Sequence, residues 1–279
     1  AKEILIMKSE LMNRFPLIDE IVVVDSGSTD RTREAAEAYG ARFYPAEDIL
    51  PDTGHHMGKG ENLWKGLYIT RGDIIVYLDA DIKNIHHRFA YGLLGPLLLT
   101  DHIKYVKAFY DRPIALGKKQ MRSTGGGRVT ELVIRPLFSL FLPELTQIIQ
   151  PLSGEYAGFR SILENIPFPI GYGVETSMIM DIYKKWGLEV IAQTDLDRRV
   201  HRNQATLALG RMAFVIMKTF INRKAKLGLI ELKKQMFDEM IQYNHVENEY
   251  QPLTYKMEGL ERPPMVEIPA YRDKFVRGN

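Results

Sequence analysis

Short apolar runs with little polar alternation place the strongest constraint on the fold of this chain. The runs at 21–24 and 74–78 are apolar and rich in Ile and Val, a pattern typical of strands buried on both faces. A helix-like segment, 30–39, follows the first run and is closed by Gly40, a usual residue after a helix end. The same patterns predict further strands at 41–44, 103–109 and 188–193, and further helices at 61–68, 129–141, 174–186, 205–222 and 229–243. This alternation predicts an α/β fold with a parallel or mixed sheet.

The two ends of the chain depart from the alternating pattern. After Asn203 the pattern changes to helices, so we divide the chain into an α/β domain at 1–203 and a helical C-terminal extension at 204–279 packed on it. Residues 1–13 have helical spacing, and the first strand-like run begins only at Glu20. Open α/β domains usually begin with a strand, so we expect a first strand and its loop to precede residue 1 in the native protein.

Composition excludes several classes of protein. The 37 Lys and Arg against 35 Asp and Glu leave a net charge of +2, and 45% of the residues are hydrophobic, which excludes whole-chain disorder and gives no nucleic-acid footprint. The absence of cysteine excludes a thiol nucleophile, a disulfide and a Cys-ligated zinc. The apolar runs fall short of the roughly 18 residues of a membrane span. We therefore expect a cytoplasmic protein with neither a nucleic-acid nor a membrane partner.

Two aspartates end one of the predicted strands. Asp79 and Asp81 follow the apolar run 74–78 directly, and because the chain bends where a strand ends, both carboxylates can reach one cavity. Paired carboxylates suit a hard divalent cation that also takes diphosphate oxygens as ligands. An acidic turn would use the same residues, but the direct passage from an apolar run into two acids favours a functional site.

Two other loops are candidates for a nucleotide site. Asp25 and Ser26 begin a small-residue loop between a predicted strand and a helix, where open α/β sheets bind ligands; an ordinary Asx turn would use the same residues. Lys59 is flanked by glycines at a predicted helix start and suits a phosphate. Because it lacks the spacing of a P-loop, a solvated lysine in a flexible loop remains the alternative.

Two further glycine-rich segments open predicted helices. In 125–131, Arg128 and the Thr130 hydroxyl accompany free backbone donors, which favours a phosphate or carboxylate site over a hinge. In 171–175, Glu175 either stabilises its own helix through the helix dipole or accepts hydrogen bonds from sugar hydroxyls.

One histidine has the neighbours expected of a ligand. His201 follows the predicted strand 188–193 among cationic and amide side chains, which makes it a candidate ligand. The histidine pairs at 55–56 and 86–87 lack such neighbours, and we expect them to be exposed loop residues.

Together these motifs resemble the glucosyl-3-phosphoglycerate synthases, which are GT-A glycosyltransferases. The resemblance covers about two thirds of the chain and is carried, in order, by VVVDSGSTDRT, GKGENLW, DIIVYLDADI, GLLGPLL, VKAFYDRP, GGGRVTELVIRPL, QPLSGEYAGFR, PFPIGYGVE and HRNQ. It implies a GT-A fold, with a Rossmann-like mixed sheet flanked by helices. It also implies a cytoplasmic homodimer that uses Mg²⁺ or Mn²⁺ and transfers glucose from UDP-glucose to the 2-hydroxyl of D-3-phosphoglycerate, with retention.

The resemblance also implies roles for individual residues. The expected metal ligands are Asp81 and His201, and the expected catalytic residues are Asp81, Lys59 and Glu175. The expected nucleotide-sugar site comprises Asp25, Ser26, Lys59, Asp79, Ala80, Leu152, Gly154, Tyr172, Gly173, Val174 and Glu175. The expected acceptor site comprises Gly126, Gly127, Arg128, Val129, Thr130, Arg199 and Asn203. The first strand of the family, with its nucleotide contacts, has no counterpart in this sequence.

The chemistry expected of such a site is front-face attack on the sugar. Negative charge develops on the departing diphosphate, where Lys59 and the metal would stabilise it, and we find no carboxylate placed as the nucleophile of a double displacement. Three alternatives remain from the sequence: a mannosyl-3-phosphoglycerate synthase using GDP-mannose, a sugar-phosphate nucleotidyltransferase, and a non-catalytic nucleotide-sugar or RNA-binding module.

Overall fold

The computed structural model describes residues 7–112, 114–116, 120–122, 127–200 and 205–275. Its strands are β1 (Val22–Asp25), β2 (Arg42–Pro45), β3 (Ile74–Tyr77), β4 (Tyr105–Asp111), β5 (Ile114–Leu116), β6 (Gln120–Arg122), β7 (Tyr156–Phe159), β8 (Phe168–Pro169), β9 (Ile191–Arg198), β10 (Glu239–Val246), β11 (Glu249–Lys256) and β12 (Glu261–Arg262). Its α-helices are α2 (Thr32–Ala38), α3 (Lys59–Ile69), α4 (Arg88–Leu99), α5 (Arg135–Phe141), α6 (Arg160–Leu163), α7 (Val174–Trp186), α8 (Thr206–Lys226) and α9 (Pro269–Phe275).

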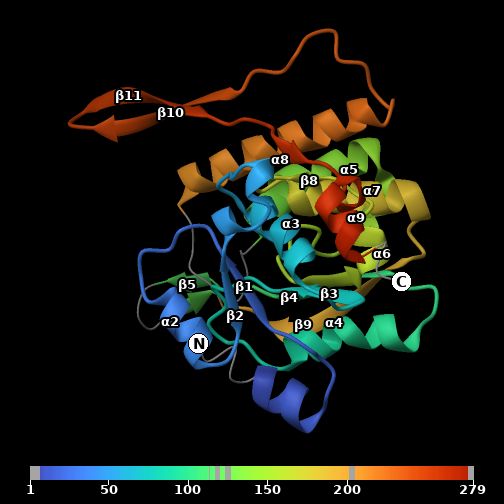
Figure 1. Cartoon of the computed structure of the whole chain (residues 1–279). Coiled ribbons are helices and arrows are strands. Elements are labelled where there is room, and N and C mark those ends of the chain that lie inside the picture. Colours follow the sequence, from blue (N-terminus) through green and yellow to red (C-terminus); the bar gives the residue numbers. More distant parts are fainter. Residues whose placement is uncertain (1–6, 113, 117–119, 123–126, 201–204, 276–279) are drawn as a thin grey trace.

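A mixed sheet lies at the centre of the molecule (Figure 1). Its strand order is β3-β7-β4-β9, with β7 antiparallel to both neighbours and β4 parallel to β9. The first two strands, β1 and β2, pair in parallel as a separate ribbon. The predicted mixed sheet is therefore confirmed.

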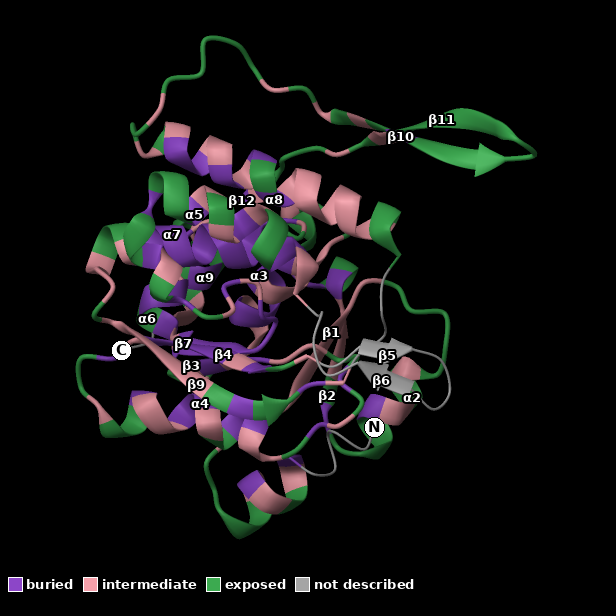
Figure 2. Cartoon of the chain, turned by 180° about the vertical axis from the view of Figure 1, so that it is seen from behind, coloured by how far each residue is buried: buried purple, intermediate pink, exposed green. Residues whose placement is uncertain are grey.

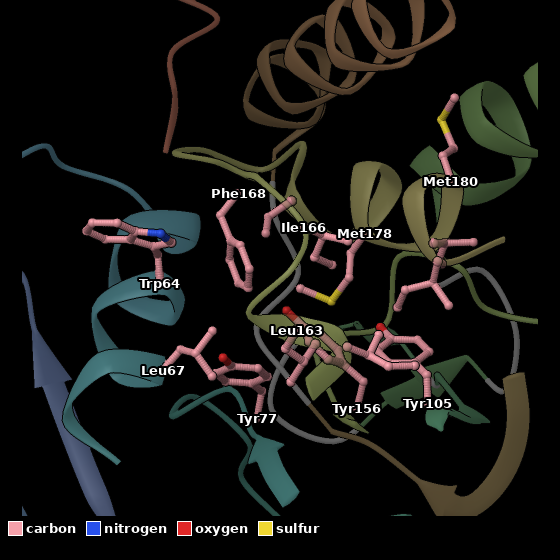
Figure 3. Close-up of a cluster of buried hydrophobic side chains, with 14 of the residues drawn as sticks. Trp64, Leu67, Tyr77, Tyr105, Tyr156, Leu163, Ile166, Phe168, Met178 and Met180 are labelled. Atoms are coloured by element: carbon pink, nitrogen blue, oxygen red, sulfur yellow. The ribbon is translucent and has the colours of Figure 1, made fainter. Parts of the chain in front are cut away.

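Helices cover both faces of this sheet. Helix α4 lies on one face, and α3, α5, α7 and α8 lie on the other (Figure 1). The larger core cluster lies on the side of α3 and α7, where Figure 3 shows Trp64 and Leu67 near Tyr77, and Tyr156 farther along the cluster. The apolar positions of the strands face these helices, which is why β3 and β4 have the pattern of strands buried on both sides.

The helical character predicted for the C-terminal part is correct for only one of its two helices. The segment 205–222 forms most of α8, but 229–243 is not a helix: irregular chain leads into the strand β10, which pairs with β11. The turn between these strands, Glu247-Asn248, has positive φ at both residues, the backbone of a tight hairpin whose twist matches its strands.

The last described residues return to the α/β part. Strand β12 pairs with β8, and Met265 and Tyr271 are fully buried in the larger core cluster. Arg262 binds the carboxylate of Glu61 at 2.7 Å and the carbonyls of the loop before α3. The C-terminal tail therefore supports the start of α3. No helix in the described part of the chain is long and apolar enough to cross a membrane.

Asp181, buried between α7 and α8, should make stability depend on pH. Burial raises its pKa to about 7, although Arg223 Nε lies 3.4 Å from Asp181 Oδ1. The folded pKa exceeds the unfolded value of 3.8, so the folded state binds the proton of Asp181 more tightly than the unfolded state does. The free energy of unfolding that this proton contributes is fully present below pH 3.8 and is lost as pH rises through 7. Relative to Asp181→Asn, the wild type should therefore lose up to roughly 4 kcal/mol of unfolding free energy between about pH 4 and pH 8. Urea unfolding at several pH values tests this; parallel curves for the two proteins would contradict it.

Candidate active site

Three charged side chains from different elements meet where β3 ends. Lys59, the first residue of α3, places its Nζ 2.6 Å from Asp79 Oδ1 and 2.7 Å from Glu175 Oε1. Asp79 follows β3, and Glu175 lies in the first turn of α7. The structure thus brings together residues that are 116 positions apart in the chain, and all three were candidates from the sequence.

Arg199 connects this cluster to Asp81. Its Nη2 donates to Asp79 Oδ2 at 2.9 Å and to Asp81 Oδ1 at 3.0 Å. Its Nε lies 3.1 Å from Oε1 of the fully buried Glu155, whose other oxygen accepts a hydrogen bond from Tyr110 at 2.5 Å. Arg199 was expected in the acceptor site, but its side chain is only 7% exposed and is occupied by these carboxylates. Arg199 therefore lies between the two aspartates and the buried Glu155.

The charged side chains of the cluster shift one another's pKa values. Burial opposes ionisation of Asp79, but Lys59 and Arg199 hold its pKa below the usual value. Burial likewise opposes the charge on Lys59, whereas Glu175 and Asp79 raise its pKa. Glu155 behaves differently, because burial and the charge of Asp79 raise its pKa. The cluster therefore presents a permanent cation at Lys59 against two carboxylates.

Glycines allow the backbone to approach this cluster closely. A Cβ added to Gly154 would lie 2.0 Å from Asp79 Oδ2, so only glycine allows the loop before β7 to pack against that carboxylate. A Cβ added to Gly60 would lie 1.8 Å from the carbonyl oxygen of Pro169. The glycine after Lys59 therefore seats the start of α3 on β8.

The nucleotide loop after β1 is held in a defined shape. The Asp25 carboxylate accepts hydrogen bonds from the Gly27 and Ser28 amides, at 2.9 and 2.7 Å, and from the Ser28 hydroxyl. Burial opposes ionisation of Asp25, yet these bonds keep its pKa below the usual value. Ser26 donates to Asn62 Oδ1 at 2.6 Å, one turn after Lys59. The Asx turn considered from the sequence is thus present, and through Asn62 it adjoins the lysine site.

The acceptor segment opens the helical stretch before α5. Gly127 has φ +79°, and Arg128 is partly exposed. The Thr130 side chain is buried. The Val129 side chain lies in the larger core cluster, so a contact with an acceptor would come from its backbone. Gly126 and Asn203 lie outside the described residues.

The expected sugar-binding segment is divided between surface and core. Tyr172 is 49% exposed and Glu175 reaches Lys59, whereas Val174 is fully buried in the core, so its side chain is unavailable to a sugar. A Cβ on Gly173 would lie 2.0 Å from the Thr219 hydroxyl of α8. Leu152 packs against the core, and Ala80 is exposed beside the aspartates.

The two carboxylates after β3 have the chemistry that a hard divalent cation needs, but they supply only part of a ligand set. Asp79 and Asp81 converge on one Arg199 nitrogen, and 69% of the Asp81 side chain is exposed, which leaves it open to an ion from the solvent side. Oxygen ligands of this kind suit Mg²⁺ or Mn²⁺. Within the described ranges no three His, Asp or Glu side chains are grouped to hold a metal by themselves, and His201, the second expected ligand, lies outside those ranges.

Several residues of the site escaped the sequence reasoning. Glu155 and Tyr110 support Arg199, Asn62 binds Ser26, and the buried Lys107 donates to the Ser153 carbonyl at 2.6 Å. An acid directly before a buried strand was the available signal for Glu155. The histidines expected to be exposed are so only in part: His55 and His86 are exposed, whereas His56 and His87 are partly buried. The His86 and His87 rings contact each other in a tilted arrangement, with centroids 3.8 Å apart.

Comparison with known proteins gives a consistent family. The model of glycosyl transferase family 2 matches residues 3–164. A glucosyl-3-phosphoglycerate synthase of Petrotoga mobilis is 56% identical over 99% of this chain and 85% of its own length. The Mycobacterium tuberculosis glucosyl-3-phosphoglycerate synthase, solved with Mn²⁺, UDP-glucose and phosphoglyceric acid, is 38% identical, with a TM-score of 0.81 over 96% of this chain and 86% of that one.

A relative with a different name has a comparable fold. Mannosyl-3-phosphoglycerate synthase from Rubrobacter xylanophilus is 36% identical, with a TM-score of 0.86 over 96% of this chain and 84% of its own. The predicted GT-A fold is confirmed by these structures. The chain therefore belongs to glycosyl transferase family 2 and, within it, to the family of the glucosyl-3-phosphoglycerate synthases.

Proposed function

We propose that this chain is a metal-dependent glycosyltransferase that moves glucose from UDP-glucose to the 2-hydroxyl of D-3-phosphoglycerate, with retention at the anomeric carbon. The observation that carries the proposal is the cluster of Lys59, Asp79, Glu175 and Arg199 at the end of β3, in a chain 56% identical to a synthase of that name. The family membership disfavours the nucleotidyltransferase and the non-catalytic binding module.

The residues divide the work between leaving group and sugar. Lys59, at the N-terminus of α3, offers its ammonium and nearby backbone donors to the diphosphate, whose negative charge grows as the glycosidic bond breaks. Glu175, held by Lys59, accepts hydrogen bonds from sugar hydroxyls. Because it is engaged by the ammonium and 4% exposed, we assign it to binding and not to nucleophilic attack.

Asp81 and His201 are the proposed ligands of the divalent cation. When bound, the cation would neutralise negative charge on the diphosphate, which makes the diphosphate a better leaving group. Arg199, which is itself held by Asp79, orients the Asp81 carboxylate through its hydrogen bond to Oδ1. The attacking 2-hydroxyl gives its proton to the departing diphosphate oxygen, on the same face of the sugar.

We also propose that the enzyme works in the cytoplasm as a homodimer. A phosphorylated three-carbon acceptor and a nucleotide sugar are intracellular metabolites, and a chain with no cysteine suits a reducing compartment. Fractionation of cells that express the protein, with its size measured in the soluble fraction, tests both statements.

The function is tested by product formation. Purified protein is incubated with D-3-phosphoglycerate, Mg²⁺ or Mn²⁺, and either UDP-glucose or GDP-mannose, beside Asp81→Asn and the control Asp101→Asn in an exposed turn. We expect metal-dependent glucosyl transfer that Asp81→Asn abolishes and Asp101→Asn retains. Transfer of mannose alone would assign the chain to the mannosyl enzymes, and binding of nucleotide without transfer from either donor would overturn the proposal.

Arg128 is expected to recognise the phosphate of the acceptor. Replacing it with alanine removes a charge-assisted contact, so KM for 3-phosphoglycerate should rise about 10- to 100-fold with a smaller change in kcat. KM for UDP-glucose should stay near the wild-type value. Arg272→Ala, an exposed arginine on α9, is the control. An unchanged KM for 3-phosphoglycerate would remove Arg128 from the acceptor site.

A further inference from the structure

One stretch of the chain, from Arg112 to Thr130, is strictly basic. It contains five Lys and Arg residues and no Asp or Glu. The proposed acceptor carries two anionic groups, a phosphate on C3 and a carboxylate on C1, next to the carbon that bears the reacting 2-hydroxyl. Arg128 is the proposed partner of the phosphate. The carboxylate loses water when it binds and therefore requires a partner of its own.

Arg112 is the first cation of this stretch, and a buried strand fixes its position. Figure 2 shows β4 running through the interior of the molecule, and Arg112 directly follows Asp111, the last residue of that strand. The Arg112 Cζ lies 4.9 Å from the centre of the Tyr110 ring, and its Nη2 donates to the Tyr110 hydroxyl at 3.1 Å. These two contacts hold the guanidinium in one orientation at the end of the sheet.

Another part of the guanidinium lies beside the acceptor segment. A Cβ added to Gly127 would lie 4.0 Å from Arg112 Nη1 and 4.0 Å from the Thr130 hydroxyl. Because glycine has no side chain, space remains here between a guanidinium nitrogen and a hydroxyl. Both groups are hydrogen-bond donors that suit an anion.

The described part of the chain leaves most donors of Arg112 unused. A guanidinium has five N–H donors, and among the described residues Arg112 has one acceptor, the Tyr110 hydroxyl. Its Nε is buried and has no hydrogen-bond partner there. Arg199 pairs with three carboxylates, whereas no carboxylate of the described residues pairs with Arg112. A partly buried cation in this condition favours binding of an anion.

The neighbours of Arg112 place it on the side of the reacting group. Tyr110, which holds the guanidinium, lies against Arg199, whose Cζ is 5.8 Å from the ring centre. Arg199 in turn binds Asp81, the proposed metal ligand. An acceptor whose phosphate is held by Arg128 must direct its 2-hydroxyl, and with it the adjacent carboxylate, toward these residues. Arg112 lies where that carboxylate would arrive.

We propose that Arg112 binds the carboxylate of the acceptor and so selects a phosphorylated 2-hydroxy acid over a phosphorylated alcohol. The inference rests on the proposed function and deepens it, because it adds a second anchor to the phosphate contact of Arg128. The planar guanidinium matches a carboxylate through two parallel hydrogen bonds. Anchors at C1 and C3 fix the carbon between them, so the 2-hydroxyl is held in position to attack the sugar.

Ligands that lack one anionic group test this assignment. D-glycerol 3-phosphate has a hydroxymethyl group in place of the carboxylate, and D-glycerate has no phosphate. Ligand-observed NMR titrations with UDP and Mg²⁺ present give the dissociation constants of both and of D-3-phosphoglycerate without any turnover. In Arg112→Gln we expect the constants for D-3-phosphoglycerate and D-glycerate to rise about 10- to 100-fold. The constant for D-glycerol 3-phosphate should stay near the wild-type value.

Two further variants serve as comparisons. Arg128→Ala should show the complementary pattern, with weaker binding of the two phosphorylated ligands and unchanged binding of D-glycerate. Arg272→Gln, at an exposed position of α9, should leave all three constants unchanged. Circular dichroism and the melting temperature report that each variant is folded.

The remaining outcomes each contradict a different statement. Equal weakening of all three ligands in Arg112→Gln would show that Arg112 only supports Tyr110 and the neighbouring chain, and unchanged binding of all three would remove it from the acceptor site. Weakening confined to the phosphorylated ligands would assign Arg112 to the phosphate. A wild type that binds none of the three ligands would overturn the proposed acceptor itself.

Discussion

Replacing Lys59 with methionine is expected to lower kcat about 100- to 1,000-fold, because the side chain is the fixed cation beside the departing diphosphate. Its Nζ lies 2.6 Å from Asp79 and 2.7 Å from Glu175, and its side chain is 23% exposed, so one side remains open to a ligand. Methionine has nearly the same length without the charge. The loss should fall mainly on kcat, because negative charge on the diphosphate is greatest in the transition state.

A matched lysine and two measurements separate catalysis from folding. Lys184→Met, at an exposed position of α7, should keep wild-type kinetics. Lys59→Met should also bind UDP more weakly by calorimetry, because the ammonium contacts the diphosphate in the ground state as well. A folded Lys59→Met protein with kcat within tenfold of wild type would show that the lysine serves only to pair Asp79 and Glu175.

The arrangement of elements could be predicted from the sequence because local signals and tertiary contacts agree. The run 74–78 becomes β3 in the middle of the fold, and 174–186 is α7 to the residue. Agreement failed at 229–243, where apolar residues among Lys and Glu give a helix-like pattern, yet Leu229, Leu232 and Phe237 are exposed and pack against nothing that would hold a helix. There the hairpin is fixed by its turn at Glu247-Asn248 and by contacts with α8, which no local pattern reveals.

The location of the site could also be predicted, because polar residues that follow buried strands collect at one end of the sheet. Asp79 was found this way, whereas Lys59 and Glu175 were found at glycine-rich helix starts, and the structure brings the three into contact. The sequence could not predict which side chains of these segments point into the site and which point into the core. Val129 carries no mark that distinguishes a core residue from a contact residue beside glycines, and packing alone decides it.

The role of Arg199 could not be foreseen for a related reason. Its partners Asp79, Asp81 and Glu155 lie 44 to 120 residues away in the chain, and an arginine close to the candidate ligand His201 suggests a ligand contact instead. Burial of Glu155 makes the difference, because a buried carboxylate needs a cation. Such a pairing follows only from the packed structure.

Replacing Arg199 with methionine is accordingly expected to destabilise the fold by about 3–5 kcal/mol, because it removes one partner of a buried ion pair and leaves Glu155 uncompensated. Glu155 is fully buried, and its remaining described partner is the Tyr110 hydroxyl. Asp79 keeps Lys59, so the cost arises mainly at Glu155. Urea unfolding measures the change, and Arg198→Met, at an exposed neighbouring position, is the control.

The double variant Arg199→Met with Glu155→Gln distinguishes support of the fold from support of the site. The neutral amide removes the buried charge, so the double variant should recover much of the stability that the single variant loses, and the two substitutions should be strongly non-additive. Activity should not recover, because Asp81 still lacks the guanidinium that directs it, and Mn²⁺ affinity measured by titration calorimetry should remain below wild type. A double variant that regains both stability and Mn²⁺ affinity would show that Arg199 serves Glu155 alone. Unchanged stability in Arg199→Met would show that Glu155 is uncharged in the fold, as its raised pKa permits.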